Sequence, residues 1–157
     1  MSVSRLTAVD LVADLVTVMA LDAQTNPHPW NEAQWLDSFA QHDCYMLRDE
    51  DNAEHALLGF AVCMVTLDEA ELLLIAIDPA RQGQGFGHQL LQQLIQLLTA
   101  NGVVKLFLEV RESNSKAQAF YQRHHLQLAG VRKGYYPTEL GRENAQLYTL
   151  ELCKETP

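Results

Sequence analysis

The sequence has few of the features that mark several common classes of protein. It contains three cysteines, Cys44, Cys63 and Cys153, and no C-x-x-C pair, so neither a disulfide framework nor a zinc site is expected. Its six histidines show no metal-ligand spacing. Lysine and arginine number 11 against 20 acidic residues, which gives a net charge of −9. This charge argues against direct nucleic-acid binding and suits a cationic substrate, such as an amine or a basic peptide, although it also fits simple solubility.

Long apolar runs are also missing. The most apolar stretch near the N-terminus, residues 11–21, is interrupted by Asp14, lacks a basic leader and a cleavage site, and is too short to span a bilayer. We therefore expect a soluble, intracellular protein without a membrane partner. At 157 residues, with 48% apolar residues and no repeats or long linkers, residues 1–157 are predicted to form a single domain.

The most informative segment that is present is the glycine-rich stretch of residues 78–88. An apolar run at 72–77 predicts a buried strand before it, and apolar residues at helical spacing across 90–98 predict a helix after it. Three glycines at alternate positions open this helix. Glycine lets a backbone approach a ligand closely, and a helix N-terminus offers free N–H groups, so the pattern predicts a diphosphate site. A helix start that binds nothing has the same pattern. No Gly-Lys-Ser/Thr is present, so a nucleoside triphosphate loop is not indicated.

The remaining patterns predict a mixed α/β sheet with helices on both faces. The expected helices cover residues 10–19, the segment after a cap at Asn31, the segment from about 87 to Asn101-Gly102, and the segment after a cap at Asn114 or Ser113. The expected strands cover residues 45–47, 57–66, 71–77, 105–110, 126–131 and 146–152.

A carboxylate stands out in the apolar strand 105–110. Alternation places Glu109 on the sheet face opposite three apolar residues, Leu106, Leu108 and Val110. A carboxylate at the end of a central strand, beside a cleft, could act as a general base. Two plainer readings stay open, because Glu109 could instead pair with Arg111 or be solvated.

Tyr121 is a second candidate for chemistry. It lies beside Phe120 on the helix that follows Asn114. An aromatic residue at helical spacing is typical of a core position. A tyrosine hydroxyl is also neutral at physiological pH, so it can give a proton to a departing thiolate.

Two segments together resemble the coenzyme site of the GNAT family, the GCN-five-related N-acetyltransferases. The first is Gln82-x-x-Gly85-x-Gly87, and the second is Val110-Arg111-Glu112-Ser113-Asn114 followed by Ala117, Ala119 and Phe120-Tyr121. Two further segments, Pro29-Trp30-Asn31-Glu32 and residues 135–145 with Tyr135-Tyr136-Pro137-Thr138, resemble the substrate turn and the substrate loop of the RimI-type alanine N-acetyltransferases in that family. The resemblance covers nearly the whole chain.

The resemblance implies a single-domain GNAT fold, with a mixed, mostly antiparallel sheet and helices on both faces, that binds acetyl-CoA as co-substrate. The diphosphate would rest on main-chain amides of Gly83, Gln84, Gly85, Phe86, Gly87 and His88. The main chain of Ile75, Ala76 and Ile77 would hold the pantetheine arm and the thioester carbonyl. Asn114 would hold the coenzyme near its thiol end.

The resemblance also implies a direct transfer mechanism, with no covalent enzyme intermediate and no metal. Glu109 would be the general base and Tyr121 the general acid. The substrate-binding residues would be Trp30, Tyr135 and Tyr136. The acceptor would be the N-terminal alanine of the eighteenth small-subunit ribosomal protein.

Three positions depart from the family pattern. Gly83 stands where many members carry arginine, which removes one cationic phosphate contact, and Leu74 stands where relatives often have a polar residue. His125-Leu126-Gln127 replaces the usual Leu-Gly-Phe after Tyr121. Two alternative functions remain open at this stage: a GNAT acetyltransferase for another amine, such as a lysine side chain, a polyamine or another protein N-terminus, and a non-catalytic CoA-binding regulatory module.

Overall fold

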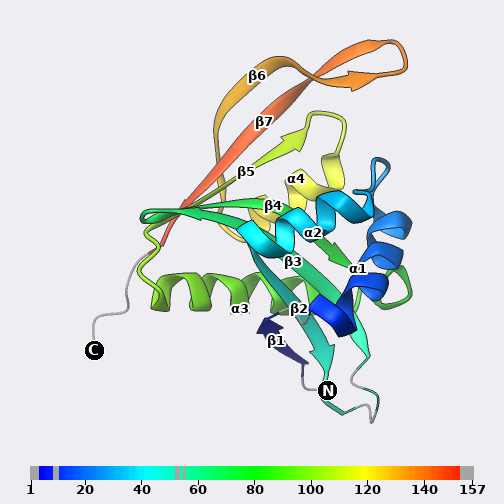
Figure 1. The fold of residues 1–157 in the computed structure, drawn as a ribbon. Helices are drawn as coiled ribbons and strands as arrows, with labels where there is room; N and C mark the ends of the chain where they lie inside the picture. Colours follow the sequence, from blue (N-terminus) through cyan, green and yellow to red (C-terminus); the bar gives the residue numbers. More distant parts are fainter. Residues whose placement is uncertain (1–3, 9–10, 52–53, 55, 153–157) are drawn as a thin grey trace.

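Seven strands form one sheet in the computed structural model, which describes residues 4–8, 11–51, 54 and 56–152 (Figure 1). The spatial order is β1-β2-β3-β4-β5-β7-β6. Neighbouring strands run antiparallel except for β4 and β5, which are parallel. The mixed, mostly antiparallel sheet predicted from the sequence is confirmed. The strands are β1 (Ser4–Ala8), β2 (Asp43–Asp49), β3 (Leu57–Thr66), β4 (Glu69–Ile77), β5 (Lys105–Arg111), β6 (Gln127–Thr138) and β7 (Gly141–Glu151).

Helices cover both faces of the sheet, as predicted. Helices α1 (Leu11–Thr25) and α2 (Glu32–Gln41) pack on one face, where Val18, Trp35 and Phe60 belong to one buried cluster. Helices α3 (Phe86–Ala100) and α4 (Ser115–Arg123) pack on the other face, where a larger cluster contains Leu90 and Leu94 of α3 and Tyr121 of α4. A short 3-10 turn, η1 (Pro79–Arg81), joins β4 to α3. Within the described residues, no helix is long and apolar enough to span a membrane.

Strand β5 shows why its sequence pattern predicted which side chains lie on each face of the sheet. Leu106, Leu108 and Val110 are buried under α3 and α4, whereas the alternate residues are only partly buried. Period-two alternation in a strand sends successive side chains to opposite faces. Glu109 therefore lies on the face opposite α3 and α4, as the alternation predicted.

Strands β4 and β5 form a fork. They pair only between Glu69–Glu71 and Lys105–Phe107, and beyond Glu71 they separate (Figure 1). From there β4 continues against β3 alone and β5 continues against β7 alone. The backbone groups of β4 that face the fork therefore have no neighbouring strand, and they are open to a ligand.

The C-terminal hairpin corrects part of the sequence prediction. Residues 135–145 were expected to form a loop, but most of them belong to β6 and β7, which extend to Thr138 and begin again at Gly141. The sequence misled because Gly134 and Pro137 interrupt the strand pattern. Strand β6 lies at the edge of the sheet, where a proline needs no ladder partner. Strand β1 was not predicted at all, and α1 extends six residues beyond the expected end at Met19.

The turn between α1 and α2 is held by one buried carboxylate. Asp22 is 1% exposed and accepts hydrogen bonds from the Trp30 main-chain N–H at 2.9 Å and from the Trp35 indole N–H at 3.2 Å. The predicted cap of α2 is confirmed, because the Asn31 and Gln34 side chains each accept the other residue's main-chain N–H. The Asp22 bond on one side and the capped start of α2 on the other therefore fix the position of Trp30.

Candidate active site

The glycine-rich loop ends in an open helix N-terminus. The first bond of α3 runs from the Gln89 N–H to the Gly85 carbonyl, so the N–H groups of residues 86–88 have no acceptor within the helix. Gly83 and Gly85 have φ values of +79° and +86°, a backbone region that glycine adopts without strain. A Cβ added at either position would meet no protein atom within 4 Å. The loop therefore presents its backbone to open space, as a diphosphate site requires.

Side chains from α4 fix this loop. Gly87 lies against the Phe120 ring, where an added Cβ would be 3.3 Å from a ring carbon. Lys116 donates to the Gln82 side chain at 3.3 Å. His88 and His124 share a hydrogen bond of 2.8 Å. The start of α3 and helix α4 therefore form one supported wall beside the fork.

Strand β4 offers alternate backbone groups to the fork. The Asp78 N–H donates to the Leu58 carbonyl at 2.8 Å, so alternation in the antiparallel ladder directs the main chain of Ala76 toward β3 as well. Ile75 and Ile77 then face away from β3. In agreement, the Ile77 carbonyl accepts a bond from a loop side chain, Gln82, at 3.2 Å. This geometry favours Ile75 and Ile77 over Ala76 as main-chain partners of a ligand.

Asn114 stands at the opposite side of the fork, at the N-terminus of α4. Its side-chain oxygen caps the helix by accepting the Ala117 N–H at 3.1 Å. The predicted cap is confirmed. The cap uses only the oxygen, so the amide NH2 of the exposed Asn114 keeps its donors for a ligand.

Glu109 lies on β5 just beyond the point where the fork opens. Its side chain is 15% exposed and pairs with Arg132 of β6 at 3.2 Å. Arg111 was the ion-pair partner of Glu109 that the sequence suggested. The structure corrects this prediction, because Arg111 pairs with Glu143 of β7 at 3.0 Å. Arg132 could not be predicted as the partner of Glu109 from the sequence. The two residues are 23 positions apart, and only the pairing of β5 with β7 and of β7 with β6 brings them together.

Glu71 is a second carboxylate in this region, and it was not predicted from the sequence as a site residue. It is the last β4 residue paired with β5, opposite Phe107, and it lies on the same sheet face as Glu109. Burial and the nearby charge of Glu109 raise the pKa of Glu71, while the charges of Arg132 and His42 oppose this rise. A glutamate inside the otherwise apolar run of β4 was the signal that could have identified it.

The two tyrosines predicted to bind substrate flank this pair of carboxylates. The Arg132 guanidinium lies 5.0 Å from the centre of the Tyr135 ring, and the Arg111 guanidinium lies 4.4 Å from the centre of the Tyr136 ring. An irregular segment of β6 between Arg132 and Tyr136 interrupts the regular pairing with β7. Burial and the charge of Glu109 raise the pKa of Tyr136, so its phenol is held in the neutral form. The structure therefore brings Glu109, Tyr135 and Tyr136 together.

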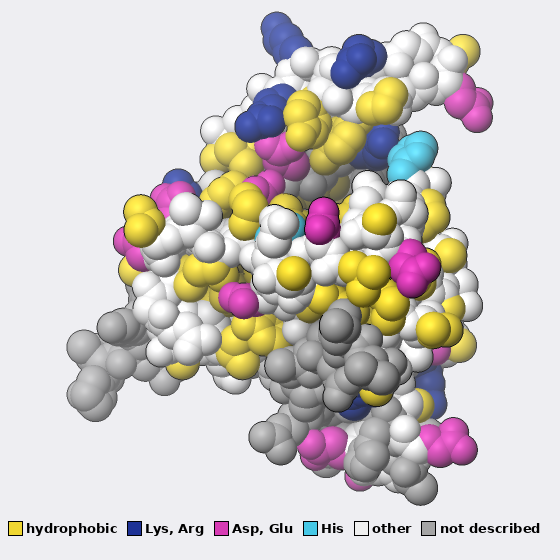
Figure 2. Space-filling model, in the orientation of Figure 1, with side chains coloured by type: hydrophobic (Ala, Val, Ile, Leu, Met, Phe, Trp, Pro, Cys, Tyr) yellow, Lys and Arg dark blue, Asp and Glu magenta, His cyan; other side chains and the backbone are white. Residues whose placement is uncertain are grey.

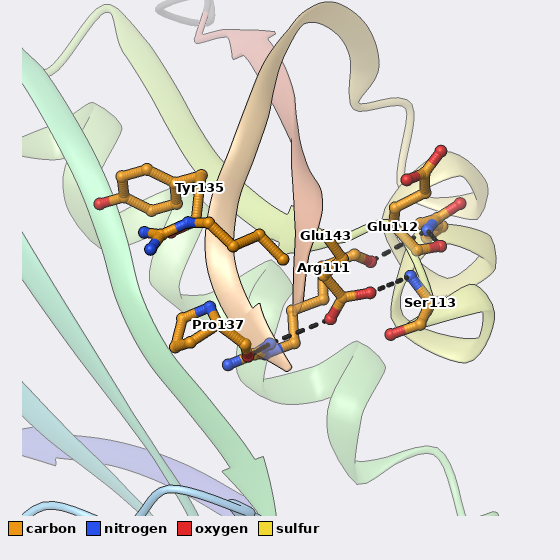
Figure 3. A network of polar contacts seen from close by, with 8 residues as sticks. Arg111, Glu112, Ser113, Tyr135, Pro137 and Glu143 are labelled. Carbon is orange, nitrogen blue, oxygen red and sulfur yellow. Dashed lines mark hydrogen bonds and ion pairs between the residues drawn. The ribbon is translucent and has the colours of Figure 1, made fainter. Parts of the chain in front are cut away.

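A polar network connects this hairpin to the Asn114 side of the fork (Figure 3). Glu143 accepts bonds from the Arg111 guanidinium at 3.0 Å and from the Ser113 main-chain N–H at 3.2 Å. Arg111 also donates to the Pro137 carbonyl at 3.2 Å. The bonds from Ser113 and Arg111 hold the pKa of Glu143 below its usual value. The network fixes the loop that carries Asn114 against the hairpin.

Charge is unevenly distributed around the fork. Figure 2 shows lysine and arginine side chains on the β6–β7 hairpin and acidic side chains directly beneath it. The hairpin, residues 127–151, is itself neutral, because Arg132, Lys133 and Arg142 are matched in number by Glu139, Glu143 and Glu151, whereas the whole chain carries a net charge of −9. The half-buried carboxylates beneath it form the acidic part of this region.

Tyr121 has a ring that packs in the core and a hydroxyl that is not fully buried. The residue is 6% exposed and belongs to the core between α4 and the sheet, so the core interpretation of its ring holds. The Tyr121 hydroxyl has no hydrogen-bond partner among the described residues, and because no fully buried polar side-chain atom lacks a partner there, this hydroxyl keeps some exposure to solvent. Burial, with a smaller contribution from Cys63, raises the pKa of Tyr121 well above its usual value. The phenol therefore stays protonated.

Trp30 is placed differently from the other predicted substrate residues. Its ring packs against Trp35, with ring centroids 5.0 Å apart, and belongs to the edge of the core under α1 and α2. It is partly buried in the turn that Asp22 fixes. Its described contacts are with this core rather than with Glu109 or the tyrosines.

The fold and the fork define a GNAT acetyltransferase. The sequence pattern of the Acetyltransferase (GNAT) family matches residues 14–126, and the chain belongs to this family. Members of the family use acetyl-CoA as co-substrate.

The chain is similar to enzymes of one particular activity within the family. It is 37% identical over 139 residues to the [ribosomal protein bS18]-alanine N-acetyltransferase of Salmonella typhimurium, which covers 88% of this chain and 92% of that one. It is 40% identical over 126 residues to the enzyme of the same name from Haemophilus ducreyi, covering 79% and 84%. The crystal structure of the ribosomal-protein-S18-alanine N-acetyltransferase from Escherichia coli superposes with a TM-score of 0.85 at 32% identity, covering 98% and 97%. The predicted resemblance to this subfamily is confirmed.

The raised pKa of Glu71 predicts a pH-dependent effect on stability. A carboxyl with a raised folded-state pKa stabilises the fold below its unfolded pKa, and this contribution is lost as the pH rises through the folded value. Glu71→Gln removes the charge that is unfavourable at neutral pH. We expect the melting temperature to rise by roughly 1–2 °C at pH 7.5, the effect of a partly exposed group in a domain of this size.

The gain should shrink toward zero at pH 4, where wild-type Glu71 is itself protonated. Glu69→Gln, two residues earlier on the same strand and exposed, is the matched control and should show no such pH dependence. Calorimetric scans at both pH values make the comparison. A Glu71→Gln variant that is less stable at pH 7.5 than at pH 4, relative to wild type, would contradict this account.

Proposed function

We propose that the chain transfers the acetyl group of acetyl-CoA to the N-terminal alanine of ribosomal protein bS18. The chemistry is supported by one arrangement, a half-buried Glu109 at the mouth of the fork with the protonated Tyr121 on α4. The choice of acceptor is supported by the relatives. Their names state this activity, and they match most of the length of this chain. We further propose that residues 1–157 are one domain and that it acts in the cytoplasm.

Coenzyme binding is assigned to the fork and the glycine loop. The main-chain N–H groups of residues 83–88 would hold the diphosphate at the positive end of α3. Ile75 and Ile77 would bind the pantetheine arm through their open backbone groups, and the Asn114 amide would hold its thiol end. Lys116, already bonded to the loop through Gln82, would supply a positive charge beside the diphosphate.

The transfer itself needs a base, a stabilised carbonyl oxygen and an acid. Acetyl-CoA supplies an acetyl group already activated as a thioester. Glu109 takes a proton from the acceptor ammonium, directly or through water, so that the free amine can attack. An N–H of β4 at the fork, such as that of Ile77, faces the negative charge that develops on the carbonyl oxygen. As the C–S bond breaks, Tyr121 gives its proton to the leaving thiolate, and the second proton that the attacking nitrogen loses, passed through solvent, restores the Tyr121 phenol.

A kinetic panel tests the proposed acceptor. The purified enzyme is given acetyl-CoA and, in separate assays, a peptide with the bS18 N-terminal sequence, the same peptide already acetylated at its N-terminus, a lysine peptide with a blocked N-terminus, and a polyamine. We expect turnover with the free N-terminal alanine peptide alone. Faster acetylation of the lysine peptide or the polyamine would replace the proposed acceptor. Coenzyme binding with no turnover on any of them would identify a non-catalytic module.

The role of Tyr121 makes a separate prediction. Tyr121→Phe keeps the buried ring and removes only the hydroxyl. We expect turnover to fall at least about tenfold, since a general acid contributes roughly 10²–10⁴-fold, while the Michaelis constant for acetyl-CoA changes little. Steady-state kinetics on the purified variant measure both. Wild-type turnover in the Phe variant would limit Tyr121 to packing and leave water as the proton source.

A further inference from the structure

Glu71 is placed to take part in binding the acceptor amine. It is the last residue of β4 held by β5, so its position is fixed by strands on both sides, β3 and β5. One step beyond its partner Phe107 on the same face of β5 lies Glu109. Residues in such a diagonal relationship on one face lie close enough for their charges to interact. Burial and the charge of Glu109 both raise the pKa of Glu71, which agrees with this placement.

The charges around this pair are not balanced. From β5 comes Glu109, from β6 come Arg132 and Tyr136, and from the C-terminal end of α2 comes His42. The two half-buried carboxylates thus share one arginine, which pairs with Glu109 and has a side chain that is 62% exposed. Within the described part of the chain, Glu71 itself makes no hydrogen bond or ion pair.

Arg132 shows what kind of group fits this position. The Arg132 guanidinium already pairs with Glu109. However, Arg132 belongs to an edge strand, is mostly exposed and also contacts the Tyr135 ring. A loosely held surface pair contributes little stability, so an incoming cation can displace it. The N-terminal ammonium of a protein is such a cation, and it is smaller than a guanidinium.

We propose that Glu71 binds the α-ammonium of the acceptor and holds it beside Glu109. The inference rests on the proposed function, because it takes Glu109 as the base. Glu71 would act in capture of the charged amine, whereas Glu109 acts in its deprotonation. The two roles therefore affect different kinetic constants.

The proton balance supports two carboxylates with one arginine. The free site holds two negative charges and one positive charge, and the bound ammonium brings the sum to zero. When the ammonium gives its proton to Glu109, the amine and Glu109 are both neutral, and the negative charge of Glu71 is balanced by the positive charge of Arg132. The N–H bond broken in the ammonium is replaced by an O–H bond in Glu109, and no net charge is created in a half-buried site, where it would be costly.

The experiment compares Glu71→Gln, Glu71→Asp and the control Glu69→Gln with wild type, using the bS18 N-terminal peptide at saturating acetyl-CoA. We expect Glu71→Gln to raise the peptide Michaelis constant about tenfold, in line with the loss of one partner from a partly buried charge pair, and to change kcat less than about threefold. Glu71→Asp should recover part of the affinity. Glu69→Gln removes the same charge from an exposed position and should match wild type.

The outcomes separate this inference from the proposed function. An unchanged peptide Michaelis constant in Glu71→Gln, with an active wild type, would overturn the role of Glu71 alone. A fall confined to kcat would assign Glu71 to proton transfer and also overturn binding. An inactive wild type on this peptide would instead overturn the proposed acceptor. Thermal melting of each variant, together with the Michaelis constant for acetyl-CoA, distinguishes loss of amine binding from a disturbed fold.

Discussion

Glu109→Gln should lower turnover about 100-fold, the lower end of the roughly 10²–10⁴-fold range for removal of a general base. Glutamine keeps the shape of the side chain but cannot accept the proton of the acceptor ammonium. The ion pair with Arg132 is also lost, but its exposed arginine makes that loss a small one for stability. Acetyl-CoA binding should be nearly unchanged, because Glu109 lies on the acceptor side of the fork.

Glu112→Gln is the matched control for this variant. Glu112 is exposed and only three residues from Glu109, so it removes the same charge nearby without touching the fork. Single-turnover acetylation of the alanine peptide compares the two variants. Near-normal turnover in Glu109→Gln, or an equal loss in Glu112→Gln, would refute a specific role for Glu109 as the base.

Gly85→Val should lower acetyl-CoA affinity by at least about 100-fold, which corresponds to the loss of two hydrogen bonds to a charged group at about 1.5–3 kcal/mol each. Gly85 caps α3 with φ at +86°, a conformation that costs a residue with a side chain about 1–2 kcal/mol. Valine would shift the loop away from this conformation, and its side chain would project into the open space above the loop.

Gly102→Val provides a matched control at the other end of α3. Gly102 has a φ of +87° and also has no atom within 4 Å of an added Cβ, so the backbone strain is alike and the coenzyme site is distant. We expect both variants to lose similar thermal stability and only Gly85→Val to lose acetyl-CoA binding. Calorimetric titration measures the affinity. Equal affinities in the two folded variants would remove the glycine loop from the coenzyme site.

The parts of the site that the sequence predicted depend on local patterns. Alternation within β5 was enough to place Glu109 opposite the buried leucines, and helical spacing with a cap was enough to place Asn114 and Tyr121 on α4. The glycine loop was predictable for the same reason, because backbone freedom and a helix start are both properties of neighbouring residues. The fold class followed from the order of these elements.

The parts that the sequence missed depend on pairing between distant strands. Arg132 reaches Glu109 across β7, and Glu71 approaches it across the parallel pair at the fork. Neither register can be derived from one strand alone. Only the outer part of the β6–β7 hairpin, residues 135–145, was interpreted as a loop, because a proline and a glycine interrupt its pattern, although an edge strand accommodates a proline.

The central claim is that this chain acetylates the N-terminal alanine of bS18, and the state of that protein in cells tests it most directly. Ribosomal proteins are isolated from three strains: cells that contain the enzyme, cells that lack it, and cells that carry the Glu109→Gln variant in its place. The mass of each intact protein is then measured by mass spectrometry. The account predicts that bS18 is heavier by one acetyl group, located on its N-terminal alanine, only in cells with the wild-type enzyme. Equal acetylation of bS18 in all three strains would contradict it.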